Sequence, residues 1–281
     1  MLPSSLCALA LDLPGVMSDN ALTAFVVILL AIGGFGLWLL VSRPGGPEGL
    51  LAEGVRLCRT AQYAEAEQCY RKALADESKL KPALKARLMV CLGDVLMDMD
   101  RYEDSRLYLE AALAMGDPRG SCRSSLADLF LLRGADPRKA LDMANQAVEA
   151  STDGLGELMS TGRAGKYFAG IVRAERWAQR AWALALLGRQ AESQESIDGA
   201  LGLAIPAHAA LVRPGSYGVS VAAGASRCLA AVYWHTGEAL LAMGQTDKAR
   251  EHFLIASEGD PKSNYGARSR RHLERMGTSA G

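Results

Sequence analysis

The chain has 281 residues, and its 31 lysine and arginine residues match its 31 aspartate and glutamate residues. A net charge near zero gives no reason to expect a nucleic-acid partner. Alanine and leucine are abundant, and apolar residues recur at three- and four-residue steps in the range 83–98, the spacing of one helical face. With no strand alternation of useful length outside the first apolar run, the sequence predicts an all-α fold.

Residues 1–20 are expected to be a short tail, with Met17 as an alternative start to Met1. Residues 21–42 come next, and the run from Ala21 to Val41 contains no charged residue. As a helix this run spans about 31 Å, the thickness of the hydrocarbon part of a bilayer. A secretory signal peptide requires a positively charged segment before its apolar core, and no lysine or arginine precedes this run. The sequence therefore predicts a transmembrane helix at 21–42.

Positive charges lie on the C-terminal side of this helix only, at Arg43, Arg56 and Arg59. The positive-inside rule then places the N-terminus outside and the remainder of the chain in the cytoplasm. The six cysteines form no closely spaced pair, which favours free thiols in a reducing compartment. Residues 43–49 are rich in proline and glycine and should form a short hinge that keeps the following domain near the membrane.

A pattern of small and large apolar residues then recurs five times. Its clearest copy contains Gly237, Leu240, Ala249, Phe253 and Ala256 and ends at Pro261. The other copies contain, in chain order, Gly54, Ala66, Tyr70 and Ala73; Gly93, Leu96, Ser105, Leu109 and Ala112; Leu131, Ala140, Ala144 and Ala147; and Trp177, Leu184, Gly188, Ile197 and Ala200.

These spacings resemble the tetratricopeptide repeat (TPR), a helix–turn–helix unit of about 34 residues. The resemblance implies a TPR-like solenoid of helical hairpins, wound as a right-handed superhelix, over residues 50–262. Residues 263–281, which include a basic stretch from Arg268 to Arg275, should form a capping helix and tail.

The repeats are not evenly spaced. The residues Ala66, Ser105, Ala140, Ser193 and Ala249, which occupy one position of the pattern, are 39, 35, 53 and 56 residues apart. Two explanations remain open for the long intervals. Either the first helices of repeats four and five are extended, or extra segments intervene near 151–170 and 204–224. Pro206 and Pro214 favour the second explanation for the later interval.

The resemblance also implies a binding site, because the first helices of TPR repeats line a concave groove that holds partner peptides. The candidate residues on that face are Arg59, Arg87, Asp94, Met97, Asp98, Arg133, Trp182, Trp234 and Glu238. The two tryptophans have inter-repeat core as an equally good interpretation. The Lys/Asn clamp of chaperone-binding TPR domains is missing, since Val55, Val90, Asp94 and Asp98 stand in its place. The mixed charges suggest a peptide or helix recognised by shape and scattered charges.

No catalytic or metal-binding pattern is present. The histidines His208, His235, His252 and His272 are scattered, and no glycine-rich stretch has the spacing of a phosphate loop. We therefore expect no enzyme activity, no cofactor and no metal. The expected function is a membrane-tethered scaffold or adaptor that recruits a protein partner. The alternatives are a periplasmic or lumenal TPR module that assists folding or assembly, and a permanent subunit of a membrane complex.

Overall fold

The computed structural model describes residues 46–75, 80–116, 120–134, 136–150, 162–215 and 217–278. They belong to one compact unit, Gly46–Gly281. The predicted membrane helix at 21–42 lies outside the described residues, and among those described no helix is long and apolar enough to cross a bilayer. The described part contains eleven helices and no strand.

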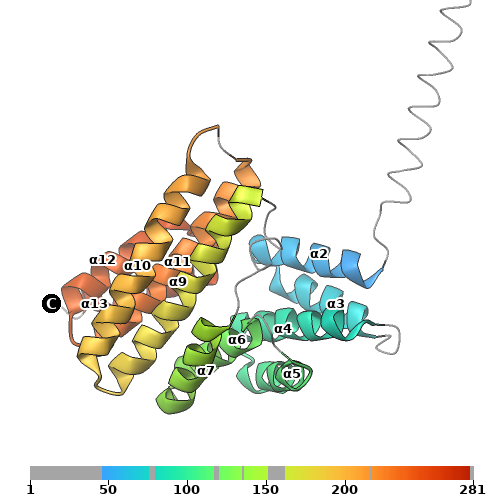
Figure 1. The fold of residues 1–281 in the computed structure, drawn as a ribbon, viewed down its shortest axis with the longest axis horizontal. Helices are drawn as coiled ribbons and strands as arrows, with labels where there is room; N and C mark the ends of the chain where they lie inside the picture. Colours follow the sequence, from blue (N-terminus) through green and yellow to red (C-terminus); the bar gives the residue numbers. More distant parts are fainter. Residues whose placement is uncertain are drawn as a thin grey trace, which may run out of the picture. The chain divides into compact units, whose positions relative to one another are not determined.

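The helices are α2 (Pro47–Arg59), α3 (Tyr63–Leu74), α4 (Pro82–Asp98), α5 (Tyr102–Ala114), α6 (Ser121–Leu132), α7 (Pro137–Glu149), α9 (Gly162–Leu186), α10 (Gln190–Val212), α11 (Val219–Ala242), α12 (Thr246–Gly259) and α13 (Asn264–Thr278). Neighbouring helices pack in pairs, α2 with α3, α4 with α5, α6 with α7, α9 with α10 and α11 with α12 (Figure 1). The helix α13 packs on the last pair. Five helical hairpins and a terminal helix therefore make up the stack.

One set of buried positions recurs in every hairpin. The five residues Ala66, Ser105, Ala140, Ser193 and Ala249, in the second helices, have no exposed surface. Nine positions earlier, in the first helices, stand the buried leucines Leu57, Leu96, Leu131, Leu184 and Leu240. Seven positions later stand the buried alanines Ala73, Ala112, Ala147, Ala200 and Ala256. Because the small residues let the two helices approach while the leucines fill the space between hairpins, one sequence pattern produces all five units.

Three of the hairpins close around a glycine and a large side chain. A Cβ atom added to Gly54 would lie 2.3 Å from the ring of Tyr70, and one added to Gly237 would lie 2.7 Å from that of Phe253. In the second hairpin the same holds for Gly93 and Leu109, again at 2.7 Å. The glycine leaves room for the ring or leucine of the facing helix, so each pair acts as one packing unit.

The last two hairpins are longer than the first three. Helices α9, α10 and α11 have 25, 23 and 24 residues, whereas α2, α3, α5, α6 and α7 have 12 or 13 and α4 has 17. The long later interval therefore comes from elongated helices, and the expectation that Pro206 marks a break is wrong. Pro206 lies inside α10 on its exposed side, where water can satisfy the carbonyl group that loses its helical hydrogen bond.

The added lengths lie together at one end of the three long helices. They comprise residues 162–173 of α9, 203–212 of α10 and 219–229 of α11, each about three turns beyond the recurring repeat positions. We call these residues the extension. Its buried side chains, which include Phe168, Ile171 and Leu211, belong to a core cluster distinct from the one around Phe253. The extension is therefore a second packed layer added to the repeat core.

Candidate functional site

The first helices of the hairpins lie next to one another, α2 beside α4, α4 beside α6, α6 beside α9, and α9 beside α11. We call the surface that these helices form the inner face. The terminal helix α13 packs against α11 on this side. The polar residues of these helices meet and form the main buried cluster of charged side chains in the described part of the chain.

A histidine and an aspartate lie at the centre of this cluster. His235 on α11 has no exposed surface, and its Nε2 lies 2.7 Å from Oδ1 of Asp128 on α6. The same Asp128 oxygen accepts a hydrogen bond of 2.8 Å from Nε2 of Gln179 on α9. His235 Nδ1 donates to the carbonyl oxygen of Ala231 at 2.8 Å, since a carbonyl can only accept. The contacts join three hairpins and suit an imidazolium ion beside a carboxylate.

The pKa of His235 agrees with this arrangement. Burial by itself lowers this pKa, but the charge of Asp128 and its hydrogen bond, together with the charge of Glu175, outweigh burial and raise it. The surroundings of His235 therefore favour its charged form more than water does.

Three further carboxyl groups on the inner face hold their protons unusually well. Burial raises the pKa of Asp94 to about 7, against a hydrogen bond from Ser125 that lowers it, and raises that of Glu175 to about 7. Burial also raises the pKa of Asp98 to about 6, although Arg227 and Arg268 lower it. Each carboxyl group loses water and lies near others of the same charge, so the site disfavours full ionisation.

The first hairpin and the last helices touch across the inner face. Arg227 Nη1 on α11 donates to the carbonyl oxygen of Cys58 on α2 at 2.8 Å. Tyr63 Oη on α3 donates to Oδ1 of Asn264 on α13 at 2.6 Å. Tyr265 Oη on α13 donates to Oε1 of Glu175 at 3.3 Å. The inner face is thus covered at this point by residues of the chain itself.

Three of the groove residues expected from the sequence lie in or beside this cluster. Asp94 and Asp98 are half-buried on α4, as described above. Glu238 on α11 is paired with His272 of α13, whose Nε2 lies 2.6 Å from its Oε1. The carboxylate of Glu238 is therefore already in contact with a side chain of the terminal helix.

Three others lie in the hydrophobic core. Met97 is buried against Leu109 in the second hairpin. The rings of Trp182 and Trp234 meet edge to face with centroids 5.3 Å apart, and the two side chains are 7% and 2% exposed. Arg268 of α13 lies over the Trp234 ring at 5.4 Å. The structure thus places both tryptophans between repeats, the second of the two interpretations left open by the sequence.

The remaining three, Arg59, Arg87 and Arg133, are exposed. Arg133 pairs with Glu103 and helps to line a shallow surface pocket of about 300 Å³. The other lining residues come from the turn between α4 and α5 and the start of α5, from Asp100 to Asp104. Arg133 is therefore separate from the inner-face cluster.

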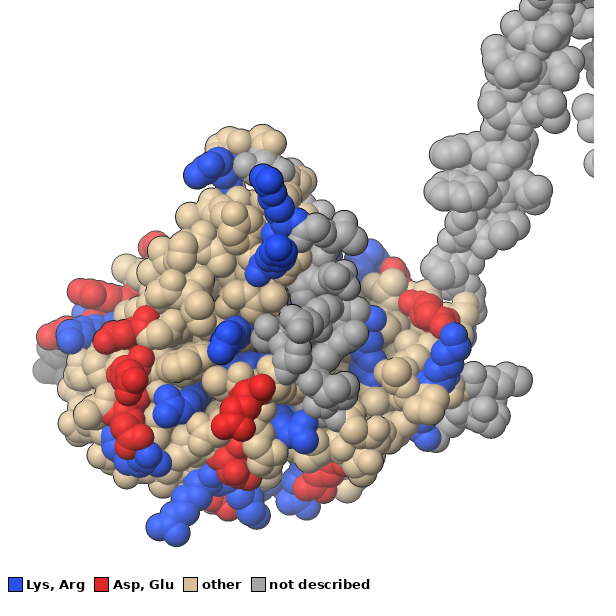
Figure 2. Space-filling view, in the orientation of Figure 1, with Lys and Arg blue, Asp and Glu red and all other residues tan. Residues whose placement is uncertain are grey.

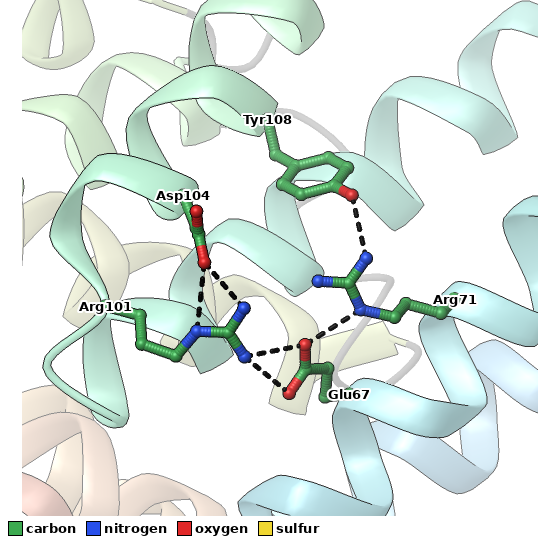
Figure 3. A network of polar contacts seen from close by, with 5 residues as sticks. All are labelled: Glu67, Arg71, Arg101, Asp104 and Tyr108. Carbon is green, nitrogen blue, oxygen red and sulfur yellow. Dashed lines mark hydrogen bonds and ion pairs between the residues drawn. The ribbon is translucent and has the colours of Figure 1, made fainter.

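A second polar network joins the second helices of the first two hairpins (Figure 3). Glu67 on α3 accepts from Arg71 at 2.8 Å and from Arg101 at 2.9 Å, while Arg101 also pairs with Asp104 and Arg71 donates to Tyr108. The arginines are 42% to 46% exposed, so these pairs add little stability. The charges already compensate one another, so this network offers no unmatched charge to a ligand.

Several inner-face residues escaped the sequence interpretation, namely Asp128, Glu175, Arg227, Asn264, Tyr265 and Arg268. One of them carried a signal. Asp128 stands twelve positions before Ala140, where Gly54, Gly93 and Gly237 stand in their own repeats. A charged residue at a position reserved for glycine indicates a buried polar contact. The α13 residues had no such signal, because the repeat pattern ends before them.

No protein-family model matches the chain, and no curated protein matches it. Among solved structures, PlcR of Bacillus thuringiensis, in complex with the peptide PapR7 and DNA, is 15% identical with a TM-score of 0.52, over 92% of this chain and 85% of that one. The fold is a TPR-like helical solenoid. Two TPR structures also match, with lower TM-scores. YrrB, a TPR protein with an unusual peptide-binding site, is 18% identical with a TM-score of 0.39, over 79% and 91% of the two chains. The TPR2AB domain of yeast Sti1, in complex with pHSP90, is 17% identical with a TM-score of 0.33, over 81% and 96%.

Proposed function

We propose that this protein is a membrane-tethered scaffold whose inner face binds a segment of a partner protein. The observation that carries the proposal is the inner-face cluster, in which the helices α4, α6, α9 and α11 bring together Asp94, Asp98, Asp128, Glu175 and His235. A buried group of charges costs stability unless its partners compensate it, so such a cluster is more typical of a binding surface than of a packing core.

The chemistry of the cluster defines the kind of partner. Asp98 on α4 lies near Arg227 and Arg268, and Asp128 on α6 pairs with His235, so both signs of charge are present. A peptide or helix with scattered charges of both signs would replace the contacts that the chain now makes with itself. In PlcR, a solved solenoid of this fold, a peptide is bound. Binding, rather than catalysis, is the function that we assign.

The tether is the apolar run within residues 21–42. The hinge expected at 43–49 is shorter than the sequence indicated, because α2 already begins at Pro47. We place the solenoid in the cytoplasm, on the side of Arg43, Arg56 and Arg59. A periplasmic or lumenal module for folding or assembly, and a permanent subunit of a membrane complex, are the alternatives.

Crosslinking of the full chain in its native membrane, followed by mass spectrometry, tests the binding site. We expect the double variant Asp98→Asn with Glu238→Gln to recover about tenfold less partner, because residues at the centre of a binding site contribute most of the binding free energy. The matched control is Glu195→Gln, an exposed carboxylate on α10. Equal recovery by both variants would show that the partner binds elsewhere. A partner that remains bound through high-salt washing would identify a permanent subunit.

Deletion of residues 21–42 tests the tether. We expect the shortened chain to leave the membrane fraction while it keeps its helical circular dichroism. A cysteine placed at the exposed Ala191 should resist an impermeant thiol reagent in intact cells. Labelling of that cysteine would reverse the proposed orientation.

A further inference from the structure

The extension has an apolar outer surface on α10. Up to Asp198 the exposed side of this helix carries acidic residues, Glu195 among them. Beyond Asp198 the same side carries Ile205, Pro206, Ala209 and Val212, which lie within about one third of the helix circumference. Ile205 is 48% exposed and Val212 is 36% exposed. One face of the helix thus changes from acidic to apolar where the extension begins.

The extension also carries exposed positive charges. Arg163, Lys166 and Arg173 are exposed on α9, and Arg213 is exposed just after α10. No aspartate or glutamate occurs between Glu157 and Glu175 or between Asp198 and Glu238. Figure 2 shows the result, since the end of the molecule at the top of the view has blue and tan atoms and the red atoms lie below it. A chain that is neutral as a whole is therefore basic at this end.

We propose that the extension lies against an anionic lipid bilayer. Ile205, Val212 and the exposed Tyr167 would enter the interface between headgroups and acyl chains, while the four cations contact the headgroups. Lysine and arginine suit this position because their long stems lie along apolar surface and their charges reach the headgroups. This contact goes beyond the proposed tether, because it would orient the solenoid on the membrane.

The charges argue against other occupants. Two copies that met through this end would place like charges against each other, which opposes a dimer. A nucleic acid would match the cations, but its phosphates gain nothing from the exposed apolar side chains of Ile205 and Val212. An anionic bilayer satisfies both parts of the surface.

Photo-crosslinking of the full chain in vesicles tests this proposal. A benzophenone amino acid replaces Ile205 in one variant and Leu254 of α12 in the other, two side chains with matched exposure of 48% and 47%. In vesicles of phosphatidylcholine with phosphatidylglycerol, we expect lipid adducts at position 205 and about tenfold fewer at position 254. Because the N-terminal tether is common to both variants, flotation of the chain with the vesicles reports on the tether and the ratio of adducts reports on the extension.

The charge requirement is tested by the triple variant Arg163→Glu, Lys166→Glu and Arg213→Glu, and by vesicles of phosphatidylcholine alone. Each change should lower the number of lipid adducts at position 205 about tenfold, because each removes several contacts between cations and anionic headgroups. Equal adducts at the two positions, or adducts that do not depend on phosphatidylglycerol, would overturn the proposal. A crosslink to a second copy, or one to an added polynucleotide in place of lipid, would overturn it in favour of that partner.

Discussion

The first three hairpins and the last two share one repeat pattern but differ in how much structure they add to it. In α2 to α7 the helices barely exceed the recurring positions, and each hairpin contributes to one continuous stack. In α9, α10 and α11 the same buried alanine, serine and leucine positions are kept, and about three further turns carry the separate core around Phe168. The repeat pattern therefore fixes how two helices pair without limiting their length. The extension could be added because its three helices lengthen together and bury one another.

The largest test of this comparison removes a ring from each core. Phe253 in the repeat core and Phe168 in the extension are 0% and 1% exposed. We expect Phe253→Ala and Phe168→Ala each to lower the free energy of unfolding by about 3–5 kcal/mol in denaturant titrations. In hydrogen exchange, Phe253→Ala should weaken protection throughout α9 to α13, whereas Phe168→Ala should act mainly in the extension.

The control for both variants is Leu254→Ala, since Leu254 is 47% exposed and the change should stay within about 0.5 kcal/mol. If Phe168→Ala weakened protection in α2 to α7 as much as it does in the extension, the extension would not be a separate layer.

Glycines separate the two regions in a second way. A Cβ at Gly237 would lie 2.7 Å from the Phe253 ring, whereas one at Gly202, at the edge of the extension, would meet no atom within 4 Å. We expect Gly237→Ala to destabilise the solenoid by about 1–3 kcal/mol through overpacking. Gly202→Ala should instead stabilise it by about 0.5–1 kcal/mol, because alanine is the better helix former. Thermal unfolding of both variants measures the difference, and a neutral Gly237→Ala would mean that the hairpin has room to adjust.

The inner face is where the two regions meet, and its carboxyl groups make their contact depend on pH. Asp94 has a folded pKa of about 7 against an ordinary value of 3.8, so the folded chain retains the proton that the unfolded chain releases. The stability that Asp94 contributes then falls as pH rises from about 4 to about 7, and the raised pKa of His235 removes stability as pH rises above its ordinary value of 6.5. We expect Asp94→Asn to reduce this loss by on the order of 1 kcal/mol, since the half-buried carboxyl group keeps part of its hydration.

Denaturant titrations at several pH values measure this effect, and Glu195→Gln on the exposed side of α10 is the matched control. A free energy of unfolding that rises with pH over the same range would contradict the assignment of Asp94, Asp98 and Glu175 as carboxyl groups that hold their protons.

The smallest expected effect lies in the turns inside the hairpins. Five positions before the buried small residue, Gly188 and Gly244 adopt φ of 75° and 76°, while Ala61 and Asp100 adopt 59° at the same place in the first two hairpins. A side chain is strained in this left-handed conformation. We expect Ala61→Gly to raise the midpoint of thermal unfolding, with a net gain of about 0.5 kcal/mol after the cost of glycine flexibility. Gly188→Ala should lower the midpoint, and a gain from both changes would rule out backbone strain as the cause.

The sequence predicted the helical hairpins because their packing depends on local spacing. Gly237 and Phe253 are sixteen positions apart, and a single helix–turn–helix unit brings residues at this separation into contact. The recurrence of the pattern in five copies supports the assignment of each copy. The composition of the inner face was predicted less well. Asp94, Asp98 and Glu238 were identified from their place on first helices, but Met97, Trp182 and Trp234 are buried in the core. Spacing alone does not decide whether a large side chain points between repeats or away from them, because both directions lie on the same half of a helix.

By itself the sequence determined the helical class, the pairing of the helices and the positions that each hairpin buries, because these follow from contacts between residues close in the chain. Only the tertiary structure decided which charges meet. Asp128, Gln179 and His235 come from three hairpins, and Arg227 reaches Cys58 across 169 residues. Such contacts depend on how the hairpins stack and on where α13 lies, and a repeat pattern specifies each unit and its neighbour but not the units beyond. The same reason applies to the extension, whose basic and apolar surface is assembled from α9 and α10 only after they have packed side by side.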